Sequence, residues 1–274
     1  MQRFTIRFIA ASLTFMIGAM MVSVWMLHRR SATTNSPGVQ STPSCSSSPA
    51  PKSTAATRKP DHRLRLLTTG EFHGDDVKAK TGEQWLGLYP GGNSFALLAS
   101  RLKINFVHDD LVDEKPKAKT GKRVGVDRRP DPIFLIKGAN LPHSGTVVTV
   151  YKEEKSLGNG AAVDLKLNGT NYRLTVVSNN EQPTDYGVGA DSKLMLTDGT
   201  TTQVLFVPSD SEMDADEPFI FLNWAGDLDG DGKLDLYMTL SPHYNVRRQV
   251  LLLSSQADEG QLVEEVAEFI ATGC

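Results

Sequence analysis

The stretch "VDLKLNGTNYRLTVVS", residues 163–178, contains two runs of alternating apolar and polar side chains on either side of Asn168-Gly169. Alternation with a period of two gives a strand one apolar face. An Asn-Gly pair tolerates the two positive φ angles that a two-residue hairpin turn requires. The stretch therefore predicts an antiparallel β-hairpin.

The neighbouring segments extend this β pattern. The stretch "KLMLTDGTTTQVLFVP" (residues 193–208) repeats it around Asp198-Gly199, and "PIFLIKG" (132–138) and "GTVVTVY" (145–151) predict two more strands. Gly and Pro interrupt the chain at short intervals, and long helical periodicity is absent between residues 63 and 255. We therefore expect a mainly β protein, with a sandwich-like antiparallel domain over residues 61–208 and a smaller β unit over residues 209–274.

The C-terminal stretch "GQLVEEVAEFIATGC" (260–274) allows two interpretations. Its apolar residues fit one helical face, whereas its β-branched content and the preceding strands favour a final strand. We expect the strand.

Four aspartates crowd into the stretch "GDLDGDGKLD", residues 226–235. Like charges this close repel one another, and a bound cation offsets that repulsion. Alternate residues of a tight loop can direct carboxylates to one point, and the seventh loop position usually contributes its backbone carbonyl. Hard oxygen ligands in this number suit Ca²⁺, which accepts six to eight of them. The predicted calcium ligands are Asp227, Asp229, Asp231, Lys233 and Asp235.

The spacing is that of an EF-hand, but the surroundings differ. Loop position 12, which supplies a bidentate Glu in an EF-hand, is Met238 here. The flanking sequences "PFIFLNW" and "LDLYMTL" predict strands, so we expect a strand–loop–strand calcium site.

The stretch "GDLDGDGKLDLYM" (226–238) resembles the calcium-loop core of FG-GAP/VCBS-type repeats, the blades of integrin-α-like β-propellers. The resemblance covers about residues 219–255 and occurs in a single copy. It implies one propeller-blade-like calcium unit beside another β domain, because a full propeller needs several blades. The matching positions are Asp227, Asp229, Asp231, Gly232 and Asp235, with Leu234 and Leu236 as the apolar pair leading into the next strand.

Two charged runs are expected to be solvated loops. The first is "SDSEMDADEP" (209–218). The alternative for this run is that Asp214 and Asp216 supply further ligands to the predicted calcium site. The second, "KPKAKTGKRVGVDRR" (115–129), is alternatively a patch for acidic glycans or anionic lipid headgroups.

The N-terminal region predicts a membrane attachment. Residues 8–27, "FIAASLTFMIGAMMVSVWML", carry no charge and are long enough as a helix to span the bilayer hydrocarbon. We expect an uncleaved anchor over residues 1–30, the alternatives being a cleaved signal peptide or a buried core helix. Residues 31–60 are rich in Ser, Thr, Pro and Ala, and predict a disordered tether.

Composition narrows the function classes. The chain has 274 residues, of which 39% are hydrophobic and 22% charged, and its net charge is −3. It therefore lacks the excess of positive charge that would indicate binding of nucleic acid. Cys45 and Cys274 are too few for a disulfide scaffold, and are either paired or free. No catalytic residue is predicted, because no nucleophile elbow, zinc-protease motif or phosphate-binding loop is present.

Weaker signals leave alternatives open. "HGDD" (73–76) and "HDD" (108–110) place His beside carboxylates, as in a metal or acid–base site, although surface turns explain both. Trp85, Tyr89 and Trp224 are expected in the core, with sugar stacking as the alternative.

The sequence thus predicts a membrane-anchored, calcium-binding β protein with an interaction or structural role, more consistent with a non-enzyme. Its C-terminal domain is expected outside the cytoplasm, in the periplasm or at the cell surface. The expected partners are calcium, the membrane, and a protein or glycan. The alternative is an envelope carbohydrate-binding or glycan-cleaving protein with a structural calcium.

Overall fold

The computed structural model describes residues 64–92, 94–139, 142–179 and 182–273. The predicted anchor, the predicted tether and both cysteines lie outside these ranges. Within them, no helix has the length and apolar character needed to cross a membrane.

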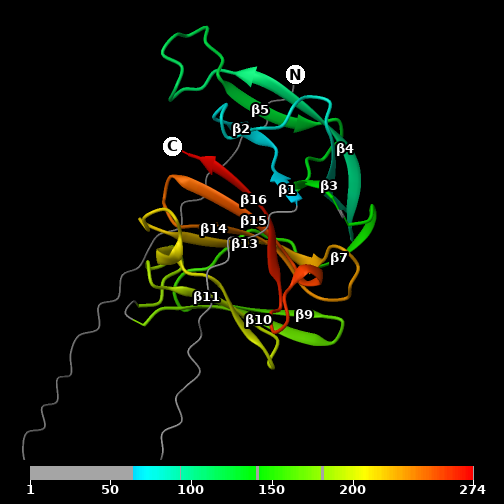
Figure 1. The fold of residues 1–274 in the computed structure, drawn as a ribbon, viewed down its shortest axis with the longest axis vertical. Coiled ribbons are helices and arrows are strands. Elements are labelled where there is room, and N and C mark those ends of the chain that lie inside the picture. The colour runs from blue at the N-terminus through cyan, green and yellow to red at the C-terminus, as the bar shows by residue number, and fades with distance from the viewer. Residues whose placement is uncertain (1–63, 93, 140–141, 180–181, 274) are drawn as a thin grey trace, which may run out of the picture. The chain divides into compact units, whose positions relative to one another are not determined.

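The described residues form antiparallel strands arranged in two sheets, with two short 3₁₀ turns, η1 (Pro208–Asp210) and η2 (Ser254–Gln256) (Figure 1). This confirms the mainly β, antiparallel class. The twelve strands of the large sheet are β1 (Leu64–Leu67), β2 (Gly70–Phe72), β3 (Gln84–Gly91), β4 (Ser94–Val107), β5 (Gly121–Val126), β6 (Leu135–Gly138), β7 (Gly145–Tyr151), β8 (Lys155–Ser156), β13 (Phe219–Asp227), β14 (Asp235–Ser241), β15 (Val246–Leu253) and β16 (Glu264–Thr272). The four strands of the small sheet are β9 (Ala162–Leu167), β10 (Thr170–Val177), β11 (Lys193–Thr197) and β12 (Thr202–Phe206).

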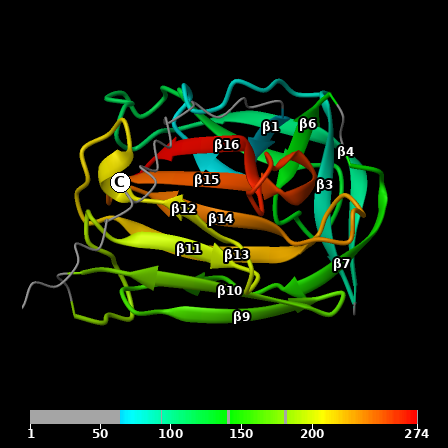
Figure 2. The same cartoon turned by 60° about the horizontal axis from the view of Figure 1, so that its bottom comes forward.

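The large sheet is nearly closed. Its strand order is β1-β6-β3-β4-β7-β13-β14-β15-β16; off this path, β5 pairs with β4, β2 pairs with β5, and β8 pairs with β13. The two end strands, β1 and β16, lie next to each other without a backbone ladder among the described residues (Figure 2). The small sheet has the order β12-β11-β10-β9.

Two apolar cores lie on opposite faces of β13–β15. On β14, Tyr237 packs inside the nearly closed sheet, against Phe134 and Trp224. Its neighbours Leu236 and Met238 pack on the other face, against the small sheet. Both faces of β14 are therefore covered, which explains why every residue of this strand is buried. The calcium-loop candidate begins and ends on these doubly covered strands.

The predicted hairpins are confirmed. Strands β9 and β10 pair around Asn168 and Gly169, whose φ values of 48° and 87° are the positive angles that the turn requires. Strands β11 and β12 pair around Asp198-Gly199. The predicted C-terminal strand is also confirmed, as β16. The division into units at residues 208 and 209 stays a prediction.

The basic run 115–129 was expected to be a solvated loop, but six of its fifteen residues, Gly121–Val126, form a strand. Strand β5 pairs with β4 and β2, and Val124 and Val126 enter the core. The charges remain outside the core: Lys122 donates to the carbonyls of Gly74 and Val77, and Arg123 pairs with Glu71. The many Lys and Arg residues conceal the alternation of this strand in the sequence.

Candidate metal centre

The aspartate loop connects β13 to β14, so the predicted strand–loop–strand arrangement is confirmed. Leu228 is buried in the core inside the large sheet, and Leu234 in the core beneath the small sheet. These two leucines fix both ends of the loop. Gly230 and Gly232 between them have φ values of 82° and 84°, where a side chain would be strained.

Three of the predicted ligands converge. Asp227, Asp229 and Asp235 each offer one carboxylate oxygen, and these atoms lie within 4.8 Å of one another. Asp227 is 8% exposed, and Asp235 is fully buried at 0%. Asp229 is intermediate in exposure.

Backbone amides orient two of these carboxylates. The Gly230 and Gly232 amides donate to the two oxygens of Asp227, at 2.7 and 3.0 Å. The amides of Leu228 and Ser254 donate to the two oxygens of Asp235, at 2.7 and 2.8 Å. Each carboxylate oxygen has two lone pairs, so these bonds leave acceptor capacity for a cation.

The other two predicted ligands lie at the surface. Asp231 is exposed, and its carboxylate accepts from the Lys233 amide at 2.8 Å and from the Ser254 hydroxyl at 3.1 Å. The Lys233 side chain is exposed. Asp231 and Lys233 stay predicted ligands.

Two serines complete the site, and the sequence analysis missed them. The Ser254 hydroxyl lies 2.9 Å from Asp235 and 3.1 Å from Asp231, so the two carboxylates share its single proton, and the Ser255 hydroxyl donates to Asp229. Both belong to η2, directly after β15. Leu236 of β14 pairs with Leu252 of β15, and this register places the residues that follow β15 beside the aspartate loop that precedes β14. The register of the β14–β15 hairpin is therefore the signal that would have identified the two serines.

The small sheet also contacts the loop. The side-chain amide of Asn168, in the β9–β10 turn, donates to the Gly232 carbonyl at 2.8 Å. A contact between residues 64 positions apart fixes the outer side of the loop to the second sheet.

The electrostatics of the cluster favour a cation. Among the ion pairs of the residues described, none involves Asp227, Asp229, Asp231 or Asp235. Burial, and next the charge of Asp229, raises the pKa of Asp235 to about 8. One buried oxygen of Asp229, Oδ1, has no hydrogen-bond partner in the described part of the chain. Carboxylates packed in this way are stabilised either by a bound proton, as the raised pKa of Asp235 shows, or by a cation.

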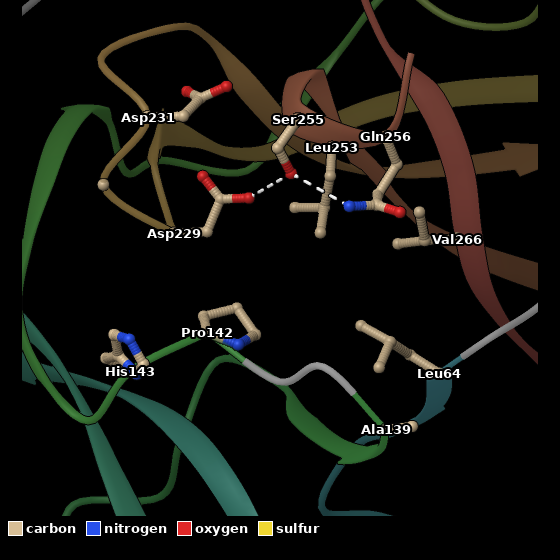
Figure 3. Close-up of a pocket in the computed structure, with 11 residues that line it drawn as sticks. Leu64, Ala139, Pro142, His143, Asp229, Asp231, Leu253, Ser255, Gln256 and Val266 are labelled. Carbon is tan, nitrogen blue, oxygen red and sulfur yellow. Dashed lines mark hydrogen bonds between the residues drawn. The ribbon is translucent and has the colours of Figure 1, made fainter. Parts of the chain in front are cut away.

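A cavity of about 370 Å³ adjoins the loop. Asp229, Ser255 and Gln256 line one side of it, and Leu64 and His143 lie across from them (Figure 3). The cluster is therefore reached from solvent on the Asp229 side.

The two His-carboxylate stretches of the sequence meet in space. His73 Nδ1 lies 2.6 Å from a carboxylate oxygen of Asp109, and His108 Nδ1 lies 3.5 Å from Asp113. The hydrogen bond from His73 is the main cause that lowers the pKa of Asp109. Thr120 also bonds to Asp113, so these contacts tie together the loops beside β2 and β5.

The three aromatic side chains weighed for sugar stacking are buried in the core. Trp85 is 3% exposed, Tyr89 4% and Trp224 0%. Arg65 lies over the Trp85 ring at 5.0 Å, which covers the face that a sugar would need.

Comparison with known proteins gave no relative. No family model matches the chain, and neither a curated protein nor a solved structure matches it.

Proposed function

We propose that the β13–β14 loop binds one Ca²⁺ and that the ion stabilises an extracytoplasmic β protein with an interaction or structural role. The observation that carries the proposal is the convergence of Asp227, Asp229 and Asp235 within 4.8 Å without a cationic side chain paired to them in the described residues. Like charges held this close in a partly buried site are stabilised by an opposite charge or by protonation of one group, and a divalent cation can bind all three carboxylates at once.

The donor atoms favour calcium among the divalent ions. All three are carboxylate oxygens, which suit Ca²⁺, Mg²⁺ and Mn²⁺ better than the softer metals that His and Cys select. Calcium accepts irregular sets of six to eight oxygens, whereas Mg²⁺ requires a small octahedron. Asp231, the Lys233 carbonyl and water supply the remaining ligands in this proposal.

The fold supports a blade-like interpretation of the calcium unit. Strands β13, β14, β15 and β16 follow one another in sequence and pair as neighbours, which is the arrangement of one four-stranded propeller blade. The aspartate loop forms the first connection of this unit, as the resemblance to FG-GAP/VCBS repeats implies. The remaining strands form the partner β domain in this proposal.

The location follows from the calcium supply and from the sequence of residues 8–27. Extracellular calcium modules often bind with a Kd of about 10⁻⁴–10⁻³ M, a concentration that resting cytosol does not provide. We therefore propose that the N-terminal segment anchors the chain and that the β domain faces the periplasm or the cell exterior.

Binding is tested directly by isothermal titration of the full chain, purified in non-ionic detergent, with CaCl₂ and with MgCl₂. We expect one calcium site in the range of about 0.05–1 mM and weaker binding of magnesium. If the calcium titration shows no heat of binding and the protein does not compete with a fluorescent chelator for calcium, the metal site is refuted.

Topology is tested separately, with protease added to intact spheroplasts. Loss of the β domain under these conditions supports the proposed orientation, and protection of the domain refutes it. This outcome is independent of the calcium titration.

The carbohydrate alternative has less support. Trp85 lines a surface pocket with Asp76 and Glu268, but its ring is buried, as described above. Asp76 accepts hydrogen bonds from Thr272, and Glu268 pairs with Arg248. Both carboxylates are thus occupied in structural contacts.

A further inference from the structure

A second groove lies at the other end of β13 from the aspartate loop. It has a volume of about 340 Å³ and is bordered by the 184–188 loop, by Glu217–Phe219 and by Tyr244. None of its residues belongs to the calcium-loop candidate.

Two exposed tyrosines border this groove. Tyr186 is 61% exposed and Tyr244 58%, and the only comparably exposed aromatic side chain elsewhere in the described residues is Phe106, at 63%. Tyr186 stacks on Phe219, with the ring centroids 6.4 Å apart and the planes 13° from parallel. Tyr244 stacks on His243 with the ring centroids 4.5 Å apart. Both tyrosines are held by a second ring while much of their surface faces water.

Backbone contacts fix the segments that border the groove. The Val188 amide donates to the Pro218 carbonyl at 3.0 Å, and the Tyr244 amide donates to the Asp216 carbonyl at 2.9 Å. Glu217 lies between these anchors with a φ of 46°, a left-handed conformation that costs about 1–3 kcal/mol for a residue with a side chain. A groove with a fixed shape loses little conformational entropy on binding.

The charge of the groove is negative. Glu217 is the one ionisable carboxylate that lines it, and no Lys, Arg or His lines it among the described residues. The adjoining stretch 209–217 contains five acidic residues and no basic one. Aromatic faces beside a carboxylate attract a cation by its charge and by cation–π contact.

A neutral sugar fits this lining less well than a cation does. Sugar recognition uses polar side chains that both donate and accept hydrogen bonds. Asn159 and Thr184 are already engaged within the fold, since Asn159 accepts a bond from Ser192 at 2.7 Å and Thr184 donates to the Gly187 carbonyl at 2.9 Å. The two tyrosine hydroxyls are the remaining groups of this kind among the described residues of the lining. Because the groove is small and open, a free amine would bury little surface there, whereas a side chain carried by a larger partner gains further contacts around the rim.

We infer that the groove between Tyr186 and Tyr244 binds a Lys or Arg side chain presented by a basic segment of a partner protein. The cationic group lies against the two tyrosines, and Glu217 neutralises its charge. This inference does not rest on calcium binding.

The test is fluorescence anisotropy of the full chain in non-ionic detergent with a labelled Gly-Arg-Gly-Lys-Gly peptide. The reference peptide carries citrulline and norleucine in place of Arg and Lys, so that it keeps its size and loses its charge. We expect the basic peptide to bind at least about 5-fold more tightly than the reference, and less tightly as the salt concentration rises.

Three variants assign the site. Tyr186→Ala, Tyr244→Ala and Glu217→Gln should each weaken binding by about 3- to 10-fold, the range that a partly exposed cation–π contact or ion pair supplies. Phe106→Ala is the matched control, because it removes an equally exposed ring elsewhere and should leave binding unchanged. Circular dichroism confirms the fold of each variant, and the high exposure of both tyrosines makes their truncation harmless to the core.

Equal binding of the two peptides would overturn the inference. So would unchanged affinity in all three variants, or binding of methyl glucoside that depends on the two tyrosines while the basic peptide does not bind.

Discussion

The substitution Asp229→Asn separates the two effects that the aspartate cluster has on stability. Asparagine keeps the size of the side chain and an oxygen that accepts the hydroxyl of Ser255, but it removes one charge from the cluster. Without calcium the variant should therefore be more stable than the wild type. With calcium the order should reverse or vanish, because one metal ligand is weakened.

The magnitudes follow from the geometry. Two unit charges at 4.8 Å, the upper bound on the separations in the cluster, repel by about 3.5 kcal/mol at an effective dielectric constant of about 20. Water on the exposed side of Asp229 screens this repulsion, and Asp235 is only partly ionised at pH 8 because its pKa is raised to about 8, so we expect a gain of about 1–2 kcal/mol in the free energy of unfolding of the metal-free variant. For the wild type, a Kd of about 0.1 mM and 1 mM free calcium give a gain of about 1.4 kcal/mol, or a rise in Tm of about 3–6 °C.

The assay is thermal melting of both proteins at pH 8 in EGTA and in 1 mM CaCl₂. Asp110→Asn serves as the control, because it makes the same change from Asp to Asn at a position outside the cluster, where the side chain is 96% exposed. Equal calcium shifts in the wild type and in Asp229→Asn would refute the metal site. A metal-free Asp229→Asn variant no more stable than the wild type would refute the repulsion.

Two further predictions concern the partners of Asp235. Ser254→Ala removes the hydroxyl contacts with Asp231 and Asp235 and keeps the backbone bond to Asp235. Urea unfolding should therefore show a free energy of unfolding lower by about 1.5–3 kcal/mol, the usual range for hydrogen bonds to charged groups. Because the pKa of Asp235 is raised from 3.8 to about 8 in the folded chain, the folded state keeps a proton that the unfolded state releases between these values. The free energy of unfolding in EGTA should therefore fall as pH rises through this window, by at most about 1.4 kcal/mol per pH unit from this group. In Asp229→Asn the fall should end at a lower pH, because loss of the Asp229 charge lowers the pKa of Asp235; an unchanged end point in that variant would contradict the coupling.

Features encoded within a few residues could be predicted from the sequence. The β9–β10 hairpin follows from alternation around Asn168-Gly169, and both determinants are local. The aspartate loop is also local, because alternate positions in one tight turn bring Asp227 and Asp229 together whatever the rest of the fold is. The strand flanks similarly distinguished this loop from an EF-hand.

Features that depend on distant pairing could not be predicted. Ser254 reaches Asp235 only through the register of β14 with β15, and His73 reaches Asp109 across 36 positions. Strand β5 was missed because Lys122 and Arg123 equal its two buried valines in number and further basic residues flank the strand on both sides. The near closure of the large sheet depends on how β1 and β16 meet, and these strands lie at opposite ends of the described chain.

The position of β1 beside β16 has a consequence for self-association. An unpaired strand edge is a template for another chain, and an open sheet would present the edges of both β1 and β16. Here β1 lies against β16, so β1 and the part of β16 beside it are not presented openly to a second molecule. On the small sheet, Gln203 of β12 bonds to the backbone of Leu262 and Val263, which occupies part of that edge as well. At these two places the described part of the chain protects its strand edges by geometry rather than by charge, and a change that shifts β1 away from β16 should promote aggregation before it unfolds either core.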